Sequence, residues 1–259
     1  MRLVRRSVVS LIALAALASM LATGAACRRS SGGAIKVAAA ADLAKAFEEV
    51  GRELTRQTGI KPAFTFGSSG LLAKQLGEGA PFDVYAAANV AYVDEVVARG
   101  ACDGATKRPY ARGRIVVWTK DAEVTSLAAL ADPRWKKIAI ANPDHAPYGK
   151  AAREALQAAG VWDQLDRDKR LVYAENVRQT LQWAQEGSAD AAIVALSLAV
   201  VTDGGKTLAI PEAMHAPLVQ ALVVCGKGAA AERGKQFVDF LGSPTGQEIM
   251  KRYGFTLPQ

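Results

Sequence analysis

The chain has 259 residues, half of them hydrophobic and 7% aromatic, which suits one large or two modest globular domains and excludes a disordered chain. Its formal net charge of +7 falls to +4 without residues 1–26, because that segment holds three arginines and no acid. No cluster of Lys and Arg is interleaved with aromatic residues, so we do not expect nucleic acid as a partner.

The N-terminal segment has the pattern of an export signal. Its three arginines precede an uncharged apolar run over residues 8–22, and small residues follow at 24–26. This order is typical of a secretory signal peptide, and the apolar run is too short for a membrane-spanning helix. We therefore predict that residues 1–26 are a signal peptide and that the protein is exported to the periplasm.

Cys27 follows the small residues directly, where bacterial lipoprotein processing attaches a lipid. A lipobox usually has leucine three residues earlier, whereas this chain has Gly24, so ordinary cleavage near Ala26 stays open. With lipidation, Cys27 would anchor the protein to a membrane through a polar tether over residues 27–33. Cys102 and Cys225 would then remain, and they could pair in an oxidising compartment.

From residue 35 onward, short apolar runs alternate with helical patterns. Asp42 has the position of an N-cap for the first helix, whose apolar residues recur at helical spacing up to Leu54. The first set has predicted strands at 35–40, 61–66 and 82–87, with helices starting near 42, 71 and 90. The second set has predicted strands at 114–118, 137–141, 171–173, 191–194 and 218–225, helices from about 150 and 177, and final helices at 230–241 and 244–253.

Such alternation predicts an α/β protein with two lobes, each a mainly parallel sheet flanked by helices. The chain would cross between the lobes twice, at the strand-like segments 114–120 and 218–225. We predict that residues 34–113 plus 222–259 form lobe 1 and that residues 114–221 form lobe 2. A cleft between two lobes is the natural ligand site.

Three strand-to-helix junctions are suited to binding an anion, because helix N-terminal amides are free there. They are residues 39–42, 67–70 and 146–149, all built from small or turn-forming residues. Ser68 and Ser69 add hydroxyl donors, so a deprotonated oxyanion could be bound without a buried Lys or Arg. The alternative is that Gly67 to Gly70 is an ordinary loop in which Ser69 only caps its helix.

Evidence for an enzyme is weaker. A hydrolase using Ser69 would need a basic partner, and only His145 and His215 offer an imidazole, each in a loop that contains proline. Residues 67–70 are not a G-x-S-x-G elbow, since the second glycine comes one residue too soon. Two histidines and no CxxC pair also leave too few ligands for a zinc site.

Four motifs in order make the chain resemble the periplasmic molybdate-binding proteins that serve ABC transporters. The resemblance runs from about residue 35 to the C-terminus, and it implies a two-lobed periplasmic binding protein that closes on its ligand. The motifs are Gly79 to Tyr85, Ile140 to Pro143 with Ala146 to Gly149, Ala174 to Val177, and Lys251 to Phe255.

Carried over by position, the resemblance implies uncharged donors at Ser69, at Tyr148 and at the amide of Val177, all directed to oxygen atoms of the anion. Many members have Ser, Thr or Asn in the first motif, whereas this chain has Ala41 and Asp42. Asp42 would repel a dianion unless it caps its own helix or accepts a proton from a ligand such as hydrogen phosphate.

A second departure from the family pattern is Ala195, where some members carry a tyrosine whose hydroxyl reaches the anion. Members with a tyrosine in the Pro-Tyr-Gly segment manage without it, and Tyr148 has that place here.

These observations predict an extracytoplasmic receptor for molybdate or tungstate that delivers its ligand to an ABC transporter permease. The predicted ligand-binding residues are Ala41, Asp42, Ser68, Ser69, Tyr148 and Val177. We expect a monomer without enzymatic activity or cofactor. The alternatives are a receptor for phosphate or sulfate and, less favoured by the sequence, a serine-dependent hydrolase.

Overall fold

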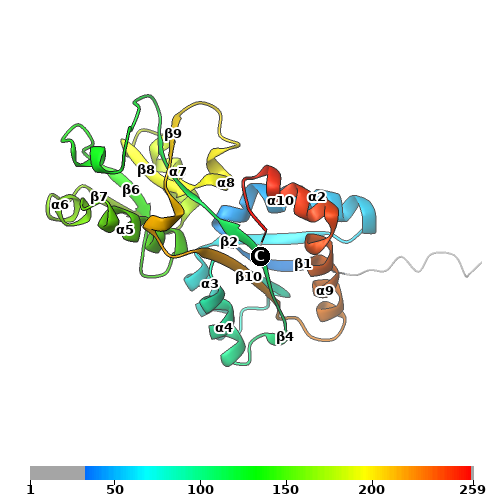
Figure 1. The fold of residues 1–259 in the computed structure, drawn as a ribbon. Coiled ribbons are helices and arrows are strands. Elements are labelled where there is room, and N and C mark those ends of the chain that lie inside the picture. Colours follow the sequence, from blue (N-terminus) through cyan, green and yellow to red (C-terminus); the bar gives the residue numbers. More distant parts are fainter. Residues whose placement is uncertain (1–32, 258–259) are drawn as a thin grey trace, which may run out of the picture. The chain divides into compact units, whose positions relative to one another are not determined.

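The computed structural model describes residues 33–257 (Figure 1). The predicted signal peptide, Cys27 with its predicted lipid, and residues 27–32 of the predicted tether lie outside the described residues. Within the described range, no helix has the length and apolar character needed to cross a membrane.

The first sheet has five strands in the order β2-β1-β3-β10-β4. The strand β1 (Ile35–Ala40) runs parallel to its two neighbours, the edge strand β2 (Pro62–Gly67) and the central strand β3 (Val84–Ala87). The late strand β10 (Leu218–Val224) lies antiparallel between β3 and the edge strand β4 (Asp103–Gly113). The C-terminal part of the chain therefore returns to the sheet that its N-terminal part begins.

Helices cover both faces of this sheet because β1 is apolar on both sides. Val37 and Ala39 belong to the core cluster that includes Phe47 and Phe237, whereas Ala38, between them, packs in a separate cluster with Leu72. The helices on the first face are α2 (Ala44–Thr58), α9 (Ala229–Gly242) and α10 (Pro244–Arg252), and those on the second are α3 (Ser69–Gly77) and α4 (Val90–Ala98) (Figure 1).

The second sheet repeats this plan in the order β7-β6-β8-β5-β9. Parallel pairing joins β6 (Ile138–Ala141) to β7 (Leu171–Ala174) and to β8 (Ala191–Ala195). The strands β5 (Ile115–Thr119) and β9 (Lys206–Ala209) complete it by antiparallel pairing. Its helices are α5 (Pro147–Ala158), α6 (Trp162–Arg167), α7 (Val177–Gln185) and α8 (Leu196–Ala199).

Two sheets flanked by helices confirm the predicted two-lobed α/β class. Each sheet is mixed, since three strands pair in parallel and a fourth, β10 or β5, runs antiparallel to both of its neighbours. The strands β4 and β9 and the helices α6 and α8 were not predicted. The predicted lobe boundary at 221/222 falls inside β10, all of which pairs within the first sheet, and the boundaries stay a prediction.

The start of the first long helix differs from the prediction. A 3-10 turn, η1 (Ala41–Leu43), separates β1 from α2, and Leu43 is the N-cap of α2. The prediction that Asp42 caps this helix is therefore wrong, because its side chain bonds to other parts of the chain and to no amide of α2. Two further 3-10 turns are η2 (Ala128–Ala131) and η3 (Glu212–Met214).

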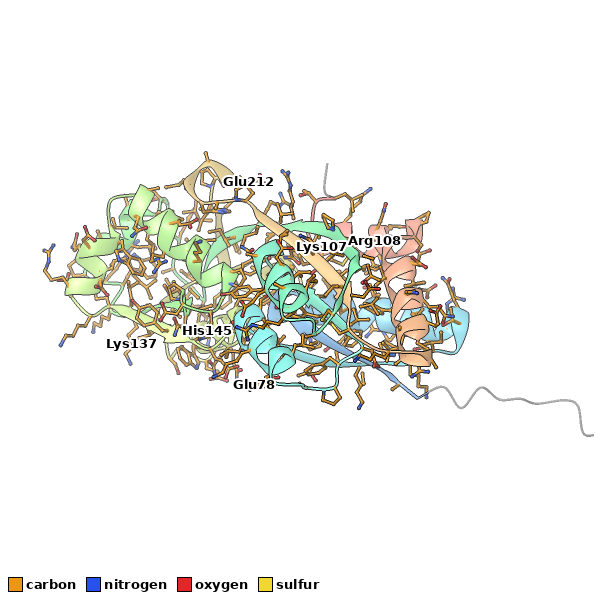
Figure 2. All side chains as sticks on the ribbon, turned by 90° about the horizontal axis from the view of Figure 1, so that it is seen from below. Glu78, Lys107, Arg108, Lys137, His145 and Glu212 are labelled. Carbon is orange, nitrogen blue, oxygen red and sulfur yellow. A yellow bond between two sulfur atoms is a disulfide. The ribbon has the colours of Figure 1, made fainter. Side chains whose placement is uncertain are left out.

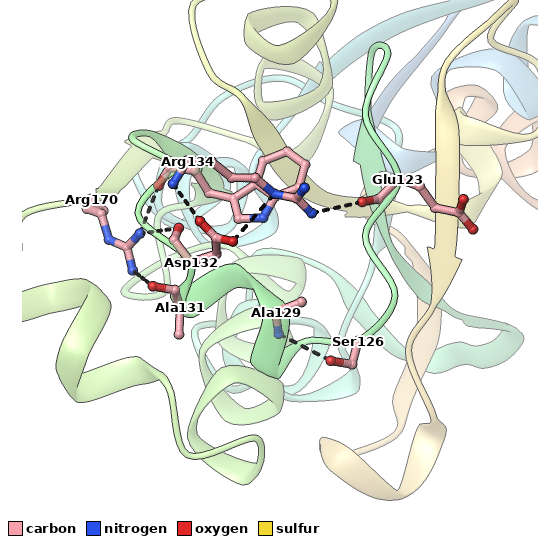
Figure 3. A network of polar contacts seen from close by, with 8 residues as sticks. Glu123, Ser126, Ala129, Ala131, Asp132, Arg134 and Arg170 are labelled. Atoms are coloured by element: carbon pink, nitrogen blue, oxygen red, sulfur yellow. Dashed lines mark hydrogen bonds and ion pairs between the residues drawn. The ribbon is translucent and has the colours of Figure 1, made fainter.

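The loop that leads into β6 is held by the buried guanidinium of Arg170 (Figure 3). Its Nη1 donates to the carbonyls of Asp132 and Trp135 at 2.8 and 3.1 Å, and its Nη2 donates to that of Ala131 at 2.9 Å. Because Arg170 directly precedes β7, these bonds fix the entry to β6 against the neighbouring strand.

A disulfide joins Cys102 and Cys225, which are 123 residues apart in the sequence. Cys102 directly precedes β4 and Cys225 directly follows β10, the strand paired with it. The two cysteines that the sequence left free to pair are therefore bonded in the structure.

Candidate functional site

A small pocket lies where the parallel strands of both sheets end. The residues that follow β1 and β2 form one side of it, and those that precede or begin α5 and α7 form the other. This is the edge at which open α/β sheets bind ligands. The space between the lining atoms, open solvent included, is about 200 Å³. It is lined by Ala40, Ala41, Asp42, Gly67, Ser68, Ser69, Ala88, Ala146, Pro147, Tyr148, Asn176 and Val177.

All six residues that the sequence predicted for ligand binding line this one pocket, although they come from four separate segments. Ala195 does not line it and is fully buried at the end of β8. The structure thus brings the predicted set together. Whether the set binds a ligand is a separate question, which depends on the donors that it offers.

Three helices of nine or more residues begin at the pocket wall. Ser69, Tyr148 and Val177 are each within the first two residues of α3, α5 and α7. Amides at these positions have no acceptor within their own helix, and a helix N-terminus carries partial positive charge. The Asn176 side chain accepts from the amides of Arg178 and Gln179 but not from that of Val177. The backbone therefore supplies uncharged donors for an anion.

The two serines differ in what their hydroxyl groups already do. Ser69 Oγ accepts a hydrogen bond from the Ala88 amide at 3.0 Å, which leaves its own hydrogen to be donated. Ser68 Oγ donates to the carbonyl of His145 at 2.6 Å, so its hydrogen is already used. Of the two, Ser69 is the better ligand donor.

His145 lies beside Ser68, on a loop that faces α3 (Figure 2). Its Nδ1 is 2.8 Å from Ser68 Oγ, and the Gly70 amide donates to its carbonyl at 2.9 Å. Because the Ser68 hydrogen goes to the backbone carbonyl, Nδ1 is the donor in this pair. In this arrangement His145 Nδ1 has no lone pair directed at the Ser68 proton.

Asp42 forms the centre of a buried network that joins the two sheets. Its Oδ2 accepts from the Tyr148 hydroxyl at 2.9 Å and from Gln220 Nε2 at 2.6 Å. The Tyr110 hydroxyl in turn donates to Gln220 Oε1 at 2.7 Å, and the Ser197 hydroxyl donates to the Asp42 carbonyl at 2.8 Å. Since Tyr148 donates its hydroxyl to Asp42, its backbone amide is the group left for a ligand.

Burial has a large effect on ionisation in this network. Desolvation raises the pKa of Asp42 to about 6, although hydrogen bonds from Gln220 and Tyr148 lower it in part. Burial, with the negative charge of Asp42 second, raises the pKa of Tyr148 well above its ordinary value. Both effects keep Tyr148 a neutral donor and leave Asp42 close to its titration point at neutral pH.

Three residues of this network were missed by the sequence analysis: Tyr110, Ser197 and Gln220. Gln220 did leave a signal, because it is a polar residue within the apolar strand β10 and is fully buried. Tyr110 lies on β4, which was not predicted. Ser197 carries no local signal.

Positive side chains and metal ligands are absent from the site as the structure describes it. Among residues 33–257, the pocket lining includes no Lys, Arg or His, and no group of three or more His, Cys, Asp or Glu side chains could hold a metal ion. The pocket therefore offers backbone dipoles and hydroxyl groups to a compact anion. It also contains one carboxyl, that of Asp42, whose raised pKa lets it be neutral or ionised near neutral pH.

Known proteins match most of the chain. Residues 35–256 match the family described as bacterial extracellular solute-binding protein. The molybdate-binding protein of Escherichia coli is 34% identical over 233 residues, 87% of this chain and 90% of that protein. That of Rhodobacter capsulatus is 32% identical over 224 residues, 86% and 88% of the two chains.

Among solved structures, the periplasmic molybdate-binding protein of Azotobacter vinelandii superimposes with a TM-score of 0.83. It is 30% identical, and the match covers 87% of this chain and all of that one. All three are thus similar to this chain in sequence along nearly their whole length, and the solved structure is similar in fold as well.

Proposed function

This chain belongs to the bacterial extracellular solute-binding protein family, and we propose that it captures molybdate in the pocket between its two sheets and delivers it to an ABC transporter permease. One observation carries the proposal: helix amides and a free serine hydroxyl meet at one small pocket without Lys or Arg. Two relatives above 30% identity, those of Escherichia coli and Rhodobacter capsulatus, are molybdate-binding proteins. Tungstate, which has the same charge and nearly the same size, is a second proposed ligand.

The proposed binding residues act on oxygen atoms of the anion. Ser69 donates its hydroxyl, and Tyr148 and Val177 donate backbone amides from the first turns of α5 and α7. Ala41 and Asp42 complete the wall next to β1, and Ser68 holds the loop of His145 in place. Size would be the main basis for rejecting sulfate, since both are tetrahedral dianions and sulfate is the smaller.

The remaining parts of the proposal concern the whole protein. We propose export by the signal peptide of residues 1–26, anchoring through Cys27, and a monomer whose lobes, 34–113 plus 222–259 and 114–221, close on the ligand. The protein acts as a receptor without catalysis. Hydrogen bonds between the lobes, such as that of Ser68 with the His145 carbonyl, are those that closure would form.

A titration tests the proposal. Molybdate or tungstate at about a hundred times its dissociation constant should stabilise the protein by roughly 2.7 kcal/mol, measured as a thermal shift or by calorimetry. Sulfate and phosphate at the same concentrations serve as matched anions. No response to any of the four would refute an oxyanion receptor.

Hydrogen phosphate is the second candidate ligand, because a buried carboxylate at Asp42 could accept its proton. The Asp42→Asn variant separates the two. If wild type binds phosphate and not molybdate, and Asp42→Asn loses phosphate while gaining molybdate, the natural ligand is hydrogen phosphate. If wild type already binds molybdate, that assignment fails.

A further inference from the structure

The two oxygens of the Asp42 carboxyl have very different surroundings. Oδ2 accepts two hydrogen bonds, from Tyr148 and Gln220. Oδ1 is buried and has no hydrogen-bond partner among the described residues. Since only 1% of Asp42 is exposed and the residue lines the pocket, an ionised Oδ1 would be a buried charge without a donor.

No Lys or Arg among the described residues forms a hydrogen bond or ion pair with the Asp42 carboxyl, although Arg112 and Arg114 flank Gly113 beside Tyr148 and Gln220. The side chains that contact its carboxyl are Tyr148 of α5 and Gln220 of β10, with Tyr110 of β4 behind Gln220. The Ser197 hydroxyl of α8 bonds its carbonyl, and the imidazole of His145 bonds Ser68 across the pocket.

Charged residues on the helices packed nearby do not bond Asp42. They are exposed or half-buried, and none of them forms a hydrogen bond or ion pair with its carboxyl among residues 33–257. They are Lys45, Glu48, Glu49, Arg52, Glu53 and Arg56 of α2, Lys150, Arg153 and Glu154 of α5, and Arg178 and Glu186 beside α7.

We propose that Asp42 binds the oxyanion in its acid form, with a protonated Oδ1 donating a hydrogen bond to a ligand oxygen, so that capture of a dianion takes up one proton. The inference rests on the proposed function and assigns a role to a buried carboxyl oxygen that has no hydrogen-bond partner among the described residues. One O–H bond forms at Oδ1 with a proton from solvent, and no other covalent bond changes. The neutral carboxyl then does what an amide or hydroxyl donor would do at that position.

Charge and hydrogen bonding both favour this state once the anion is present. A dianion beside an ionised carboxylate in a buried pocket is strongly repelled, whereas a neutral carboxyl donates to it. Once protonated, Oδ1 also gains a hydrogen-bond partner, the ligand oxygen to which it donates. Because burial places the pKa of Asp42 near 6 before a ligand binds, the proton is within reach at neutral pH.

Calorimetry of wild-type protein measures the proton directly. Molybdate is titrated at about pH 7.5 in two buffers of different ionisation enthalpy, and the difference in observed heat gives the number of protons exchanged. We expect uptake of about one proton per molybdate. The dissociation constant should rise about tenfold per pH unit from about pH 6.5 to about pH 8.5, a range in which molybdate stays a dianion.

Two variants complete the test. Asp42→Asn supplies a permanent neutral donor of the same shape, so its molybdate affinity should be independent of pH and its proton uptake near zero. Asp144→Asn changes an exposed acid on the His145 loop and should keep the wild-type proton uptake. Circular dichroism checks that both variants fold. If a variant does not fold, the proton uptake measured with wild-type protein still tests the proposal.

The outcomes separate this inference from the function on which it rests. If wild type binds molybdate with no proton uptake and a constant affinity across this range, the acid form of Asp42 is excluded while the receptor function holds. Proton uptake that persists in Asp42→Asn excludes it equally. If neither wild type nor Asp42→Asn binds molybdate even at about pH 6, the proposed function itself fails.

Discussion

The Tyr148 hydroxyl donates to Asp42 Oδ2 across 2.9 Å and thereby joins the first turn of α5 to the 3-10 turn after β1. Each residue packs with a different sheet, so this bond is one that closure of the lobes would make. A variant that lacks this hydroxyl shows how much the Tyr148 side chain contributes to binding, apart from the backbone amide of the same residue.

Tyr148→Phe should weaken molybdate binding by about 1 kcal/mol, roughly fivefold, because the amide donor remains and only the bond to Asp42 is lost. The bond from Tyr148 lowers the pKa of Asp42, so its loss should raise that pKa. The affinity should then begin to fall at a higher pH than in wild type. Calorimetry across pH measures both. Tyr173→Phe, an exposed tyrosine on β7, is the matched control, and an equal effect there would refute the assignment.

Ser69→Ala tests the hydroxyl that is free to donate. We expect a loss in molybdate affinity of about 1.5–3 kcal/mol, or roughly ten- to a hundredfold, because a hydrogen bond to a charged ligand disappears. Ser68→Ala should cost less, since Ser68 Oγ bonds the His145 carbonyl, which keeps its bond from the Gly70 amide. If Ser68→Ala is the more damaging variant in the same titration, the serine assignment is reversed.

The residues that line the pocket could be predicted from the sequence because each junction is a short apolar strand followed by small residues, which is a local pattern. The network behind Asp42 could not be predicted in that way. Gln220 is 178 residues away in the sequence, and its contact with Asp42 depends on β10 returning to the first sheet. The wrong prediction for Asp42 has the same origin. An N-cap is predicted from neighbouring residues alone, whereas the side chains that bond Asp42 are distant in the sequence.

The strand β4 was missed for a different reason. It is an edge strand with Pro109, several charged residues and shifts in its pairing with β10, so it lacks the apolar alternation of an inner strand. Its neighbour β10 was predicted because both of its faces are buried.

Asp42→Asn should stabilise the ligand-free protein in a pH-dependent manner. The pKa of Asp42 rises from 3.8 to about 6 on folding, so the folded state of wild type binds more protons between these values. The contribution of Asp42 to stability is therefore full below pH 3.8 and is lost as pH rises through about 6. The variant should exceed wild type by up to about 3 kcal/mol above neutral pH. Urea unfolding at several pH values measures the difference in unfolding free energy between variant and wild type. A difference that does not change with pH would contradict the ionisation of Asp42 as its cause.

Gly113→Ala should disturb the same network by steric contact. A Cβ at this position would lie 2.1 Å from the Tyr148 hydroxyl and 3.0 Å from Gln220 Nε2, both in a buried environment. We expect a loss of about 1–3 kcal/mol in stability together with weaker molybdate binding, measured by thermal unfolding and calorimetry. Gly242→Ala, where a Cβ meets nothing within 4 Å, is the control. Unchanged affinity in Gly113→Ala would show that the hydroxyl of Tyr148 is not needed in its present position.

Loss of the Cys102–Cys225 disulfide should lower stability and leave binding unchanged. The bond closes a long loop, since 123 residues separate the cysteines, and such a crosslink contributes roughly 2–5 kcal/mol. Because β10 is antiparallel to β3, its Val224 end lies beside Val84, at the opposite end of β3 from Ala87 and the pocket. The double variant Cys102→Ser with Cys225→Ser should therefore unfold at a lower temperature, while its molybdate affinity stays within about twofold of wild type. A large loss of affinity at a temperature where the variant is fully folded would mean that the packing of β10 reaches Gln220 and so the ligand pocket.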